Sequence, residues 1–146
     1  MRVTTWAEYG LLVSIHLARR GGETPTAARD MAEREGLPAD YVEQILLKLR
    51  RAGLVNSVRG AKGGYFLARD PSEITVKDVI EAAENRTFVV NCDLHRVSSV
   101  RCGPGSECTI RPVWRELQHR VDDLLASISL ADMLRHESEV EELVAG

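Results

Sequence analysis

Three cysteines, Cys92, Cys102 and Cys108, lie in one short segment and are separated by nine and five residues. Thiolates are soft ligands that suit iron–sulfur clusters and zinc. The segment contains no Cys-x-x-Cys pair, which disfavours a zinc ribbon. Because polar residues surround the cysteines, we interpret them as cluster or metal ligands. Redox-active thiols and incidental cysteines are the alternatives.

The spacing leaves the fourth ligand open. His95 and Glu107 lie beside the cysteines in sequence, and Glu8 lies on the first predicted helix, from which it would reach them across a subunit contact. Imidazole and carboxylate groups both ligate metals. A single residue of either kind is more often a solvated surface group, so none of the three stands out.

Basic residues define a second candidate site. The net charge is −3, yet residues 1–70 carry 11 Lys/Arg against 8 Asp/Glu, and residues 71–146 carry 8 against 14. Between Lys48 and Arg69 there are six basic residues and no acidic one. A local positive field can bind a polyanion even on an acidic protein, so this segment indicates nucleic-acid binding.

The sequence Arg59-Gly60-Ala61-Lys62-Gly63-Gly64 separates two short apolar segments, which predicts a β-hairpin with two cations at its tip. A simple turn is one alternative. A nucleotide-phosphate loop is another, but the Gly-Lys-Ser/Thr spacing of that loop is absent. Beside DNA, Arg59 would grip a phosphate or enter the minor groove, and Lys62 would contact the backbone.

The helix predicted over residues 37–52 precedes this hairpin and is amphipathic. The major groove of B-DNA admits one such helix, in which Glu43 would accept from a cytosine amino group and Gln44 would pair with adenine. We therefore predict a DNA-binding surface on this helix and the hairpin, formed by Asp40, Tyr41, Glu43, Gln44, Lys48, Arg59 and Lys62.

The rest of the sequence predicts the helices and turns that position these candidate residues. Helices are predicted over residues 5–18 and from Thr24-Pro25-Thr26, where Thr would cap the helix, to Gly36. Thr75-Val76-Lys77-Asp78 predicts a capping box. Residues 85–107 read as a long loop, and Ser129-Leu130-Ala131-Asp132 is predicted to cap a short final helix. The acidic tail is expected to be solvated and mobile.

A long helix over residues 109–128 carries an apolar stripe, which consists of Trp114, Leu117, Val121, Leu124, Leu125 and Ile128. We expect it to pack against a second copy, with burial in the chain's own core as the alternative. The fold class is mainly α with a small β-wing: a winged helix-turn-helix DNA-binding domain plus a long C-terminal dimerisation helix. Residues 1–84, 85–108 and 109–146 are the predicted DNA-binding, cysteine-containing and dimerisation parts.

Composition excludes several classes of protein. With 146 residues, 44% hydrophobic and 28% charged, the chain is typical of a globular domain and unlike a collagen or a coiled coil. No apolar run is long enough for a membrane span, and the absence of a signal-like start favours the cytoplasm. No Ser/His/Asp or paired-carboxylate arrangement points to an enzyme.

Several motifs together resemble the iron–sulfur cluster regulators related to IscR and NsrR, which are dimeric winged-helix transcription factors. The resemblance covers nearly the whole chain. Its motifs are Met1-Arg2-Val3-Thr4, Tyr41-Val42-Glu43-Gln44, Gly53-Leu54-Val55, Val58-Arg59-Gly60, Gly63-Gly64-Tyr65, the three cysteines and Trp114-Arg115-Glu116-Leu117. The hairpin motif is the most specific of them.

The resemblance implies an iron–sulfur cluster, of the 2Fe–2S or 4Fe–4S type, held by the three cysteines in a homodimer that binds a near-palindromic operator. The signal would be cluster supply, iron, redox state or nitric oxide. The sequence departs from the IscR-like pattern, because Arg111 stands where a histidine is expected, and the first cysteine gap is longer. NsrR-like members use a carboxylate of the partner's first helix, which makes Glu8 the preferred fourth ligand. In some relatives a histidine one turn later assists this carboxylate; here that residue is Leu12.

Two other functions compete with this one. The first is a cluster-free winged-helix repressor that uses the cysteines as a thiol switch or a zinc site. The second is an enzyme or an electron carrier, which an operator-binding assay would separate from a regulator.

Overall fold

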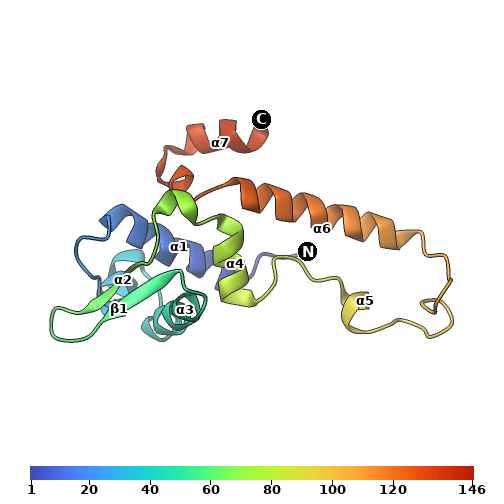
Figure 1. Ribbon diagram of the computed structural model, residues 1–146, viewed down its shortest axis with the longest axis horizontal. Coiled ribbons are helices and arrows are strands. Elements are labelled where there is room, and N and C mark those ends of the chain that lie inside the picture. The colour runs from blue at the N-terminus through green and yellow to red at the C-terminus, as the bar shows by residue number, and fades with distance from the viewer.

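The chain folds into helices and one β-hairpin, in the order that the sequence predicts (Figure 1). The computed structural model describes residues 1–146, apart from the side chains of Asp93 and Leu94. The elements are α1 (Thr5–Arg20), α2 (Ala28–Glu35), α3 (Ala39–Arg51), β1 (Val55–Val58), β2 (Gly64–Leu67), a 3-10 turn (Pro71–Glu73), α4 (Val76–Glu84), α5 (Asn91–Leu94), α6 (Ile110–Ser127), a second 3-10 turn (Asp132–Leu134) and α7 (Glu137–Ala145).

Helices α1 to α4 share one apolar core. The N–H of Ala7 donates to the hydroxyl of Thr4 at the start of α1, and the helix ends at Gly21 in the left-handed conformation that glycine adopts readily. The largest fully buried side chains of this core are Leu17, Met31, Ile45, Leu46, Leu49, Ile74 and Leu130. This core fixes the orientation of α3 relative to the hairpin.

Helix α2 begins at Ala28, after the predicted start at Thr24-Pro25-Thr26. The backbone N–H of Thr26 donates to the carbonyl of Tyr65 at 2.9 Å, and the N–H of Tyr65 returns a hydrogen bond to the carbonyl of Thr26 at 2.8 Å. This pairing holds Thr26 extended, so the helix starts at Ala28, and its N-cap, Ala27, makes no side-chain cap. The predicted threonine cap is therefore wrong, because a tertiary strand contact uses that residue.

The hairpin confirms the predicted wing. Strands β1 and β2 are antiparallel, and Val55 pairs with Leu67 while Val58 pairs with Gly64. Gly64 has φ +153°, and a Cβ there would lie 2.4 Å from the carbonyl atoms of Thr26. Only glycine allows this close approach, which holds the base of the wing against the start of α2.

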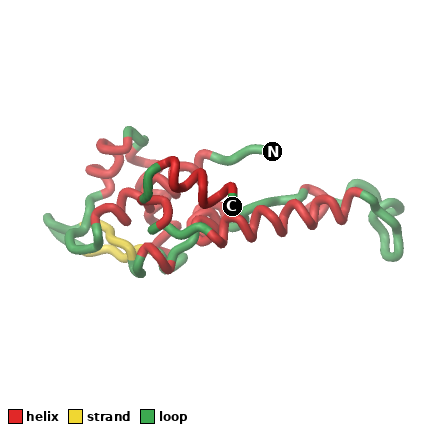
Figure 2. The backbone as a smooth tube through the Cα atoms, turned by 90° about the horizontal axis from the view of Figure 1, so that it is seen from above, coloured by secondary structure: helices red, strands yellow, loops and turns green.

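Helix α6 runs away from the compact part of the molecule, as Figures 1 and 2 show from two sides. None of its described residues is fully buried, although it is amphipathic, and Val113 and Leu124 are among its exposed apolar side chains. Its C-terminal end packs on α4. None of the helices in the described part of the chain combines the length and hydropathy that a membrane span requires.

Two segments differ from the sequence prediction. The long loop contains one helical turn, α5, which is too short to show helical periodicity in a sequence. The acidic tail, which is exposed to solvent as predicted, forms the helix α7, which the sequence did not indicate. Its first N–H group, that of His136, donates to the carboxylate of Glu139 at 3.0 Å, and acidic residues favour a helix N-terminus.

Candidate functional site

Helix α3 has one buried face and one exposed face, which a helix needs in order to enter a DNA groove. Val42, Ile45 and Leu49 are fully buried against the core. The side chains predicted to contact DNA on the other face, Asp40, Glu43 and Gln44, are exposed to solvent. Their carboxylate and amide groups are thus free to meet base edges.

Tyr41 is also on this face but belongs to an aromatic cluster. Its ring centroid lies 5.0 Å from that of Trp6 and 5.7 Å from that of Tyr9, both on α1. The ring is 38% exposed, so it both packs α3 on α1 and presents an edge to solvent. Sequence patterns did not reveal this cluster, because its members lie on two helices that only the fold brings together.

Lys48 is already engaged by contacts within the chain. Its Nζ donates to the carbonyl oxygen of Ala83 at 3.0 Å and lies 4.4 Å from the centroid of the Trp6 ring. The side chain is half-buried, and it joins α3 to α1 and to the end of α4. The Lys48 ammonium thus links three helices, and a role for it in DNA binding stays a prediction.

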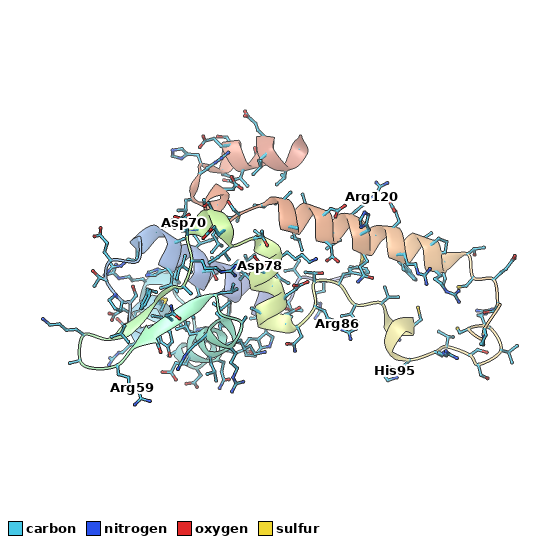
Figure 3. The ribbon with its side chains drawn as sticks, viewed as in Figure 1. Arg59, Asp70, Asp78, Arg86, His95 and Arg120 are labelled. Carbon is cyan, nitrogen blue, oxygen red and sulfur yellow. The ribbon has the colours of Figure 1, made fainter. Side chains whose placement is uncertain are left out.

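The wing presents two cations to solvent. Arg59 and Lys62 are both exposed in the connection between β1 and β2, and Arg59 points away from the body of the molecule (Figure 3). Neither takes part in an ion pair within the described part of the chain. The wing and the exposed face of α3 thus leave the residues predicted to contact phosphates and bases open to solvent.

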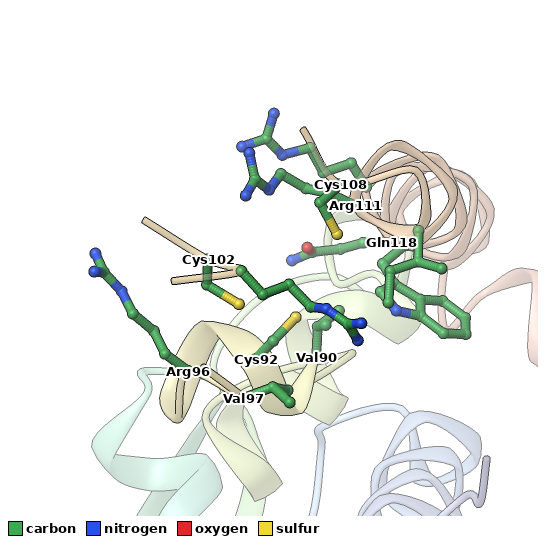
Figure 4. Close-up of a pocket in the computed structure, with 12 residues that line it drawn as sticks. Val90, Cys92, Arg96, Val97, Cys102, Cys108, Arg111 and Gln118 are labelled. Atoms are coloured by element: carbon green, nitrogen blue, oxygen red, sulfur yellow. The ribbon is translucent and has the colours of Figure 1, made fainter. Parts of the chain in front are cut away.

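The three cysteines line one cavity of about 240 Å³ beside the N-terminal end of α6. Cys92 comes from α5, Cys102 from the following turn, and Cys108 from the residue pair before α6, and their sulfur atoms point into the cavity (Figure 4). All three are half-buried free thiols. Apolar side chains, Val90 and Trp114 among them, complete the wall. The fold thus brings together the three residues that the sequence singled out.

The donor set of this cavity suits an iron–sulfur cluster better than a hard cation, because it consists of three thiols within an apolar wall. The sulfur atoms share the cavity without forming a closed set: no three described His, Cys, Asp or Glu side chains are close enough to hold a metal ion. None of the considered fourth ligands, Glu8, His95 and Glu107, lines the cavity of its own chain. Glu8 is exposed in the first turn of α1.

Arginines also line the cavity and were not singled out by their sequence positions. Arg96 and Arg101 come from the loop, and Arg111 and Arg115 lie one turn apart on α6. The i,i+4 spacing of the last two is the one sequence signal that they share a face.

The cavity and the wing lie at opposite ends of the molecule. In Figure 1 the hairpin and the loop after α5 are separated by the compact part and the length of α6. The cysteine cavity and the DNA-binding surface therefore make no direct contact within one chain.

The chain is similar to known transcriptional regulators along almost its full length. Residues 3–136 match the model of the Rrf2 family, described as "Iron-dependent Transcriptional regulator". The "HTH-type transcriptional regulator IscR" of Photorhabdus laumondii is 35% identical over 146 residues, which cover all of this chain and 85% of that protein.

Two solved structures agree. The structure of "T. potens IscR" has 38% identity and a TM-score of 0.70, covering 98% of this chain and 90% of that one. The structure of CymR, "the Global Cysteine Regulator of B. subtilis", has 34% identity and a TM-score of 0.74, covering 91% and 95%. These relatives are regulators and not enzymes. The winged-helix fold, the family model and the full-length identity agree: the chain is a transcriptional regulator of the Rrf2 family.

Proposed function

We propose that this regulator binds an operator as a homodimer and senses iron, cluster supply, redox state or nitric oxide through an iron–sulfur cluster. The observation that carries the proposal is the convergence of Cys92, Cys102 and Cys108 on one cavity. A bound cluster supplies one-electron chemistry and sensitivity to iron, oxygen and nitric oxide. The cysteines would hold it, and Glu8 of the second subunit is the proposed fourth ligand.

The cysteines lie in one segment but adjoin different helices, so a group that binds all three would link those helices. Cys92 lies on α5, whereas Cys108 adjoins α6. Joining them through a common centre ties α5 to the end of α6, and releasing them frees the residues between. A carboxylate ligand is harder and more labile than a thiolate, which suits a sensor better than an electron carrier.

The exposed apolar face of α6 supports the dimer. An 18-residue amphipathic helix with no fully buried residue needs a partner surface, and a second copy of α6 provides a self-complementary one. Two wings related by a two-fold axis then meet two half-sites, which is why the proposed operator is near-palindromic. A cytoplasmic location follows from this DNA-binding role.

A thiol switch is the second candidate function. The similarity to CymR, which is described as a cysteine regulator, and the three free thiols in one cavity favour it. In that function the cysteines would form and break disulfides or hold zinc, while α3 and the wing would bind the operator in the same way.

The test is anaerobic purification followed by an absorbance spectrum and assays of iron and acid-labile sulfide per subunit. We expect a coloured protein with matched iron and sulfide, whose content collapses in Cys102→Ser. Glu8→Ala should leave the cysteines intact and give a cluster that is lost faster in air. His119→Ala, which changes an exposed α6 residue outside the cavity, should behave like the unchanged protein.

A colourless protein after anaerobic reconstitution would contradict the cluster and leave the thiol switch or a zinc site. Zinc analysis and thiol counting would then separate those two. Equal cluster lifetimes in the unchanged protein and Glu8→Ala would remove Glu8 from the ligand set.

A further inference from the structure

The cysteine cavity is lined by positively charged side chains, although the protein as a whole is acidic. The four arginines Arg96, Arg101, Arg111 and Arg115 line it, and no Asp or Glu does among the side chains that the structure describes. Residues 85–115 contain five arginines against two acidic residues, in a chain with a net charge of −3. Positive charge is therefore concentrated around the thiols.

Nothing else in the described part of the chain neutralises these four groups. None of them takes part in an ion pair within 4.0 Å, although other surface arginines do, such as Arg120 with Glu116 at 2.8 Å. Four like charges around one cavity raise the positive potential there, so an anion that enters the cavity is attracted.

The beginning of α6 adds to the same field. This helix has no side-chain cap and no acidic residue in its first turn, and its first residues, Ile110 and Arg111, line the cavity. Unsatisfied N–H groups at a helix N-terminus favour negative charge. Because the arginines and the helix end act in the same direction, the cavity is an anion site as well as a thiol site.

We propose that the cysteine cavity recruits small anionic thiol-reactive molecules, in particular low-molecular-weight disulfides that carry carboxylates, to the three thiols. In the reaction a cysteine thiolate attacks one sulfur of the disulfide. A new S–S bond to the protein forms, the S–S bond of the small molecule breaks, and its other half leaves as a thiolate with the electron pair. No further oxidant is needed.

The test compares two disulfide reagents on the reduced, metal-free protein under anaerobic conditions. Dithiobis(nitrobenzoate) carries two carboxylates, whereas dithiodipyridine is neutral. The ratio of their rate constants cancels the intrinsic reactivity of each thiol, so it reports the field around it. A small neutral thiol, mercaptoethanol, supplies the reference ratio.

We expect the ratio for the protein to exceed that of mercaptoethanol at low salt and to fall toward it at about 1 M salt, where the screening length is about 3 Å. The variants Arg111→Gln and Arg115→Gln should each lower the ratio about threefold, and the paired loop variant Arg96→Gln/Arg101→Gln should lower it further. Arg120→Gln is the matched control, because it removes the same charge from the same helix outside the cavity.

A ratio that is equal in the unchanged protein and the cavity variants would overturn the proposal. So would an equal decrease in Arg120→Gln, because the effect would then belong to net charge. The measurement uses cluster-free protein, so its result is independent of the cluster assay: either proposal can fail while the other stands.

Discussion

Glu43 is the residue on α3 for which we predict a contact with one specific base. Its carboxylate is exposed, and in the major groove it can accept a hydrogen bond from the amino group of cytosine. Glu43→Ala should therefore relax the preference at one base pair by about 1–3 kcal/mol, measured by competition among operator variants.

Glu141→Ala provides a control for this prediction, because it removes an exposed carboxylate from α7, outside the predicted DNA-binding surface. An unchanged base preference in Glu43→Ala would exclude Glu43 as a base reader. A change that is uniform across all sequences would indicate an electrostatic effect on the phosphates instead.

Residue types in the sequence identified the cysteines, but not the charges around them. Cys92, Cys102 and Cys108 stand out by spacing alone, and the structure brings them to one cavity. Lys48 shows the limit of this reasoning: its helical position predicts a solvent-facing cation, yet its ammonium is held by Ala83 and Trp6. Such contacts link elements that are distant in sequence and have no local pattern.

The predicted role of the wing is tested by measuring how operator affinity depends on salt concentration. Arg59 and Lys62 are exposed at its tip and unpaired within the described part of the chain. Each phosphate contact releases counterions, so Arg59→Ala or Lys62→Ala should weaken operator binding and lower the slope of log affinity against log salt by about 1. Filter binding or anisotropy over a salt series measures this slope.

Arg29→Ala is the control for the wing, because Arg29 is an exposed arginine of α2 that pairs with Glu33. A wing variant with the slope of the unchanged protein would remove the wing from the DNA-binding surface.

The turn after α6 depends on a reciprocal hydrogen-bonded pair. The N–H and hydroxyl of Ser129 both donate to Asp132 Oδ2 at 2.9 Å, and the N–H of Asp132 donates back to the Ser129 hydroxyl. These hydrogen bonds, that of the Ser129 backbone first, hold the pKa of Asp132 below its ordinary value. The charged carboxylate is thus favoured in the folded state.

Asp132→Ala should lower the free energy of unfolding by about 1 kcal/mol at neutral pH. Because the folded-state pKa is depressed, this stabilisation is complete above the unfolded-state pKa of about 4 and is lost as pH falls through the folded-state value. Urea unfolding at several pH values should show the difference from the unchanged protein narrowing below about pH 4. Asp123→Ala, an exposed α6 carboxylate, is the control, and a difference that is constant with pH would contradict the assignment.

The sequence predicted where an element begins when contacts between neighbouring residues fix that position. The capping box at Thr75 and Asp78 is present as predicted, with hydrogen bonds of 3.1 and 2.9 Å. The start of α2 was mispredicted, because Thr26 pairs with Tyr65, which lies far away in sequence. The wing itself was predicted correctly from its glycines and flanking apolar residues.

At the scale of the whole molecule, α6 is expected to hold two subunits together. Leu124 is 46% exposed on this helix, so Leu124→Glu should leave the fold intact, shift the protein from dimer to monomer and reduce operator affinity. Sedimentation and DNA binding would measure both effects. Val144→Glu on α7 is the matched control, because that side chain is equally exposed at 46%. A dimeric Leu124→Glu protein would exclude this face of α6 as the interface.

The wing and the cysteine cavity are two separate sites on one molecule, so any coupling between them also acts from the promoter back to the cavity. Coupling between two sites is reciprocal: if filling the cavity changes operator affinity by some factor, operator binding changes the affinity of the cavity for its occupant by the same factor. Under the proposed function, the operator is thus an effector of the sensor. Regulator molecules on a promoter respond to the signal at a different threshold from those free in solution, so each operator sequence sets its own sensitivity.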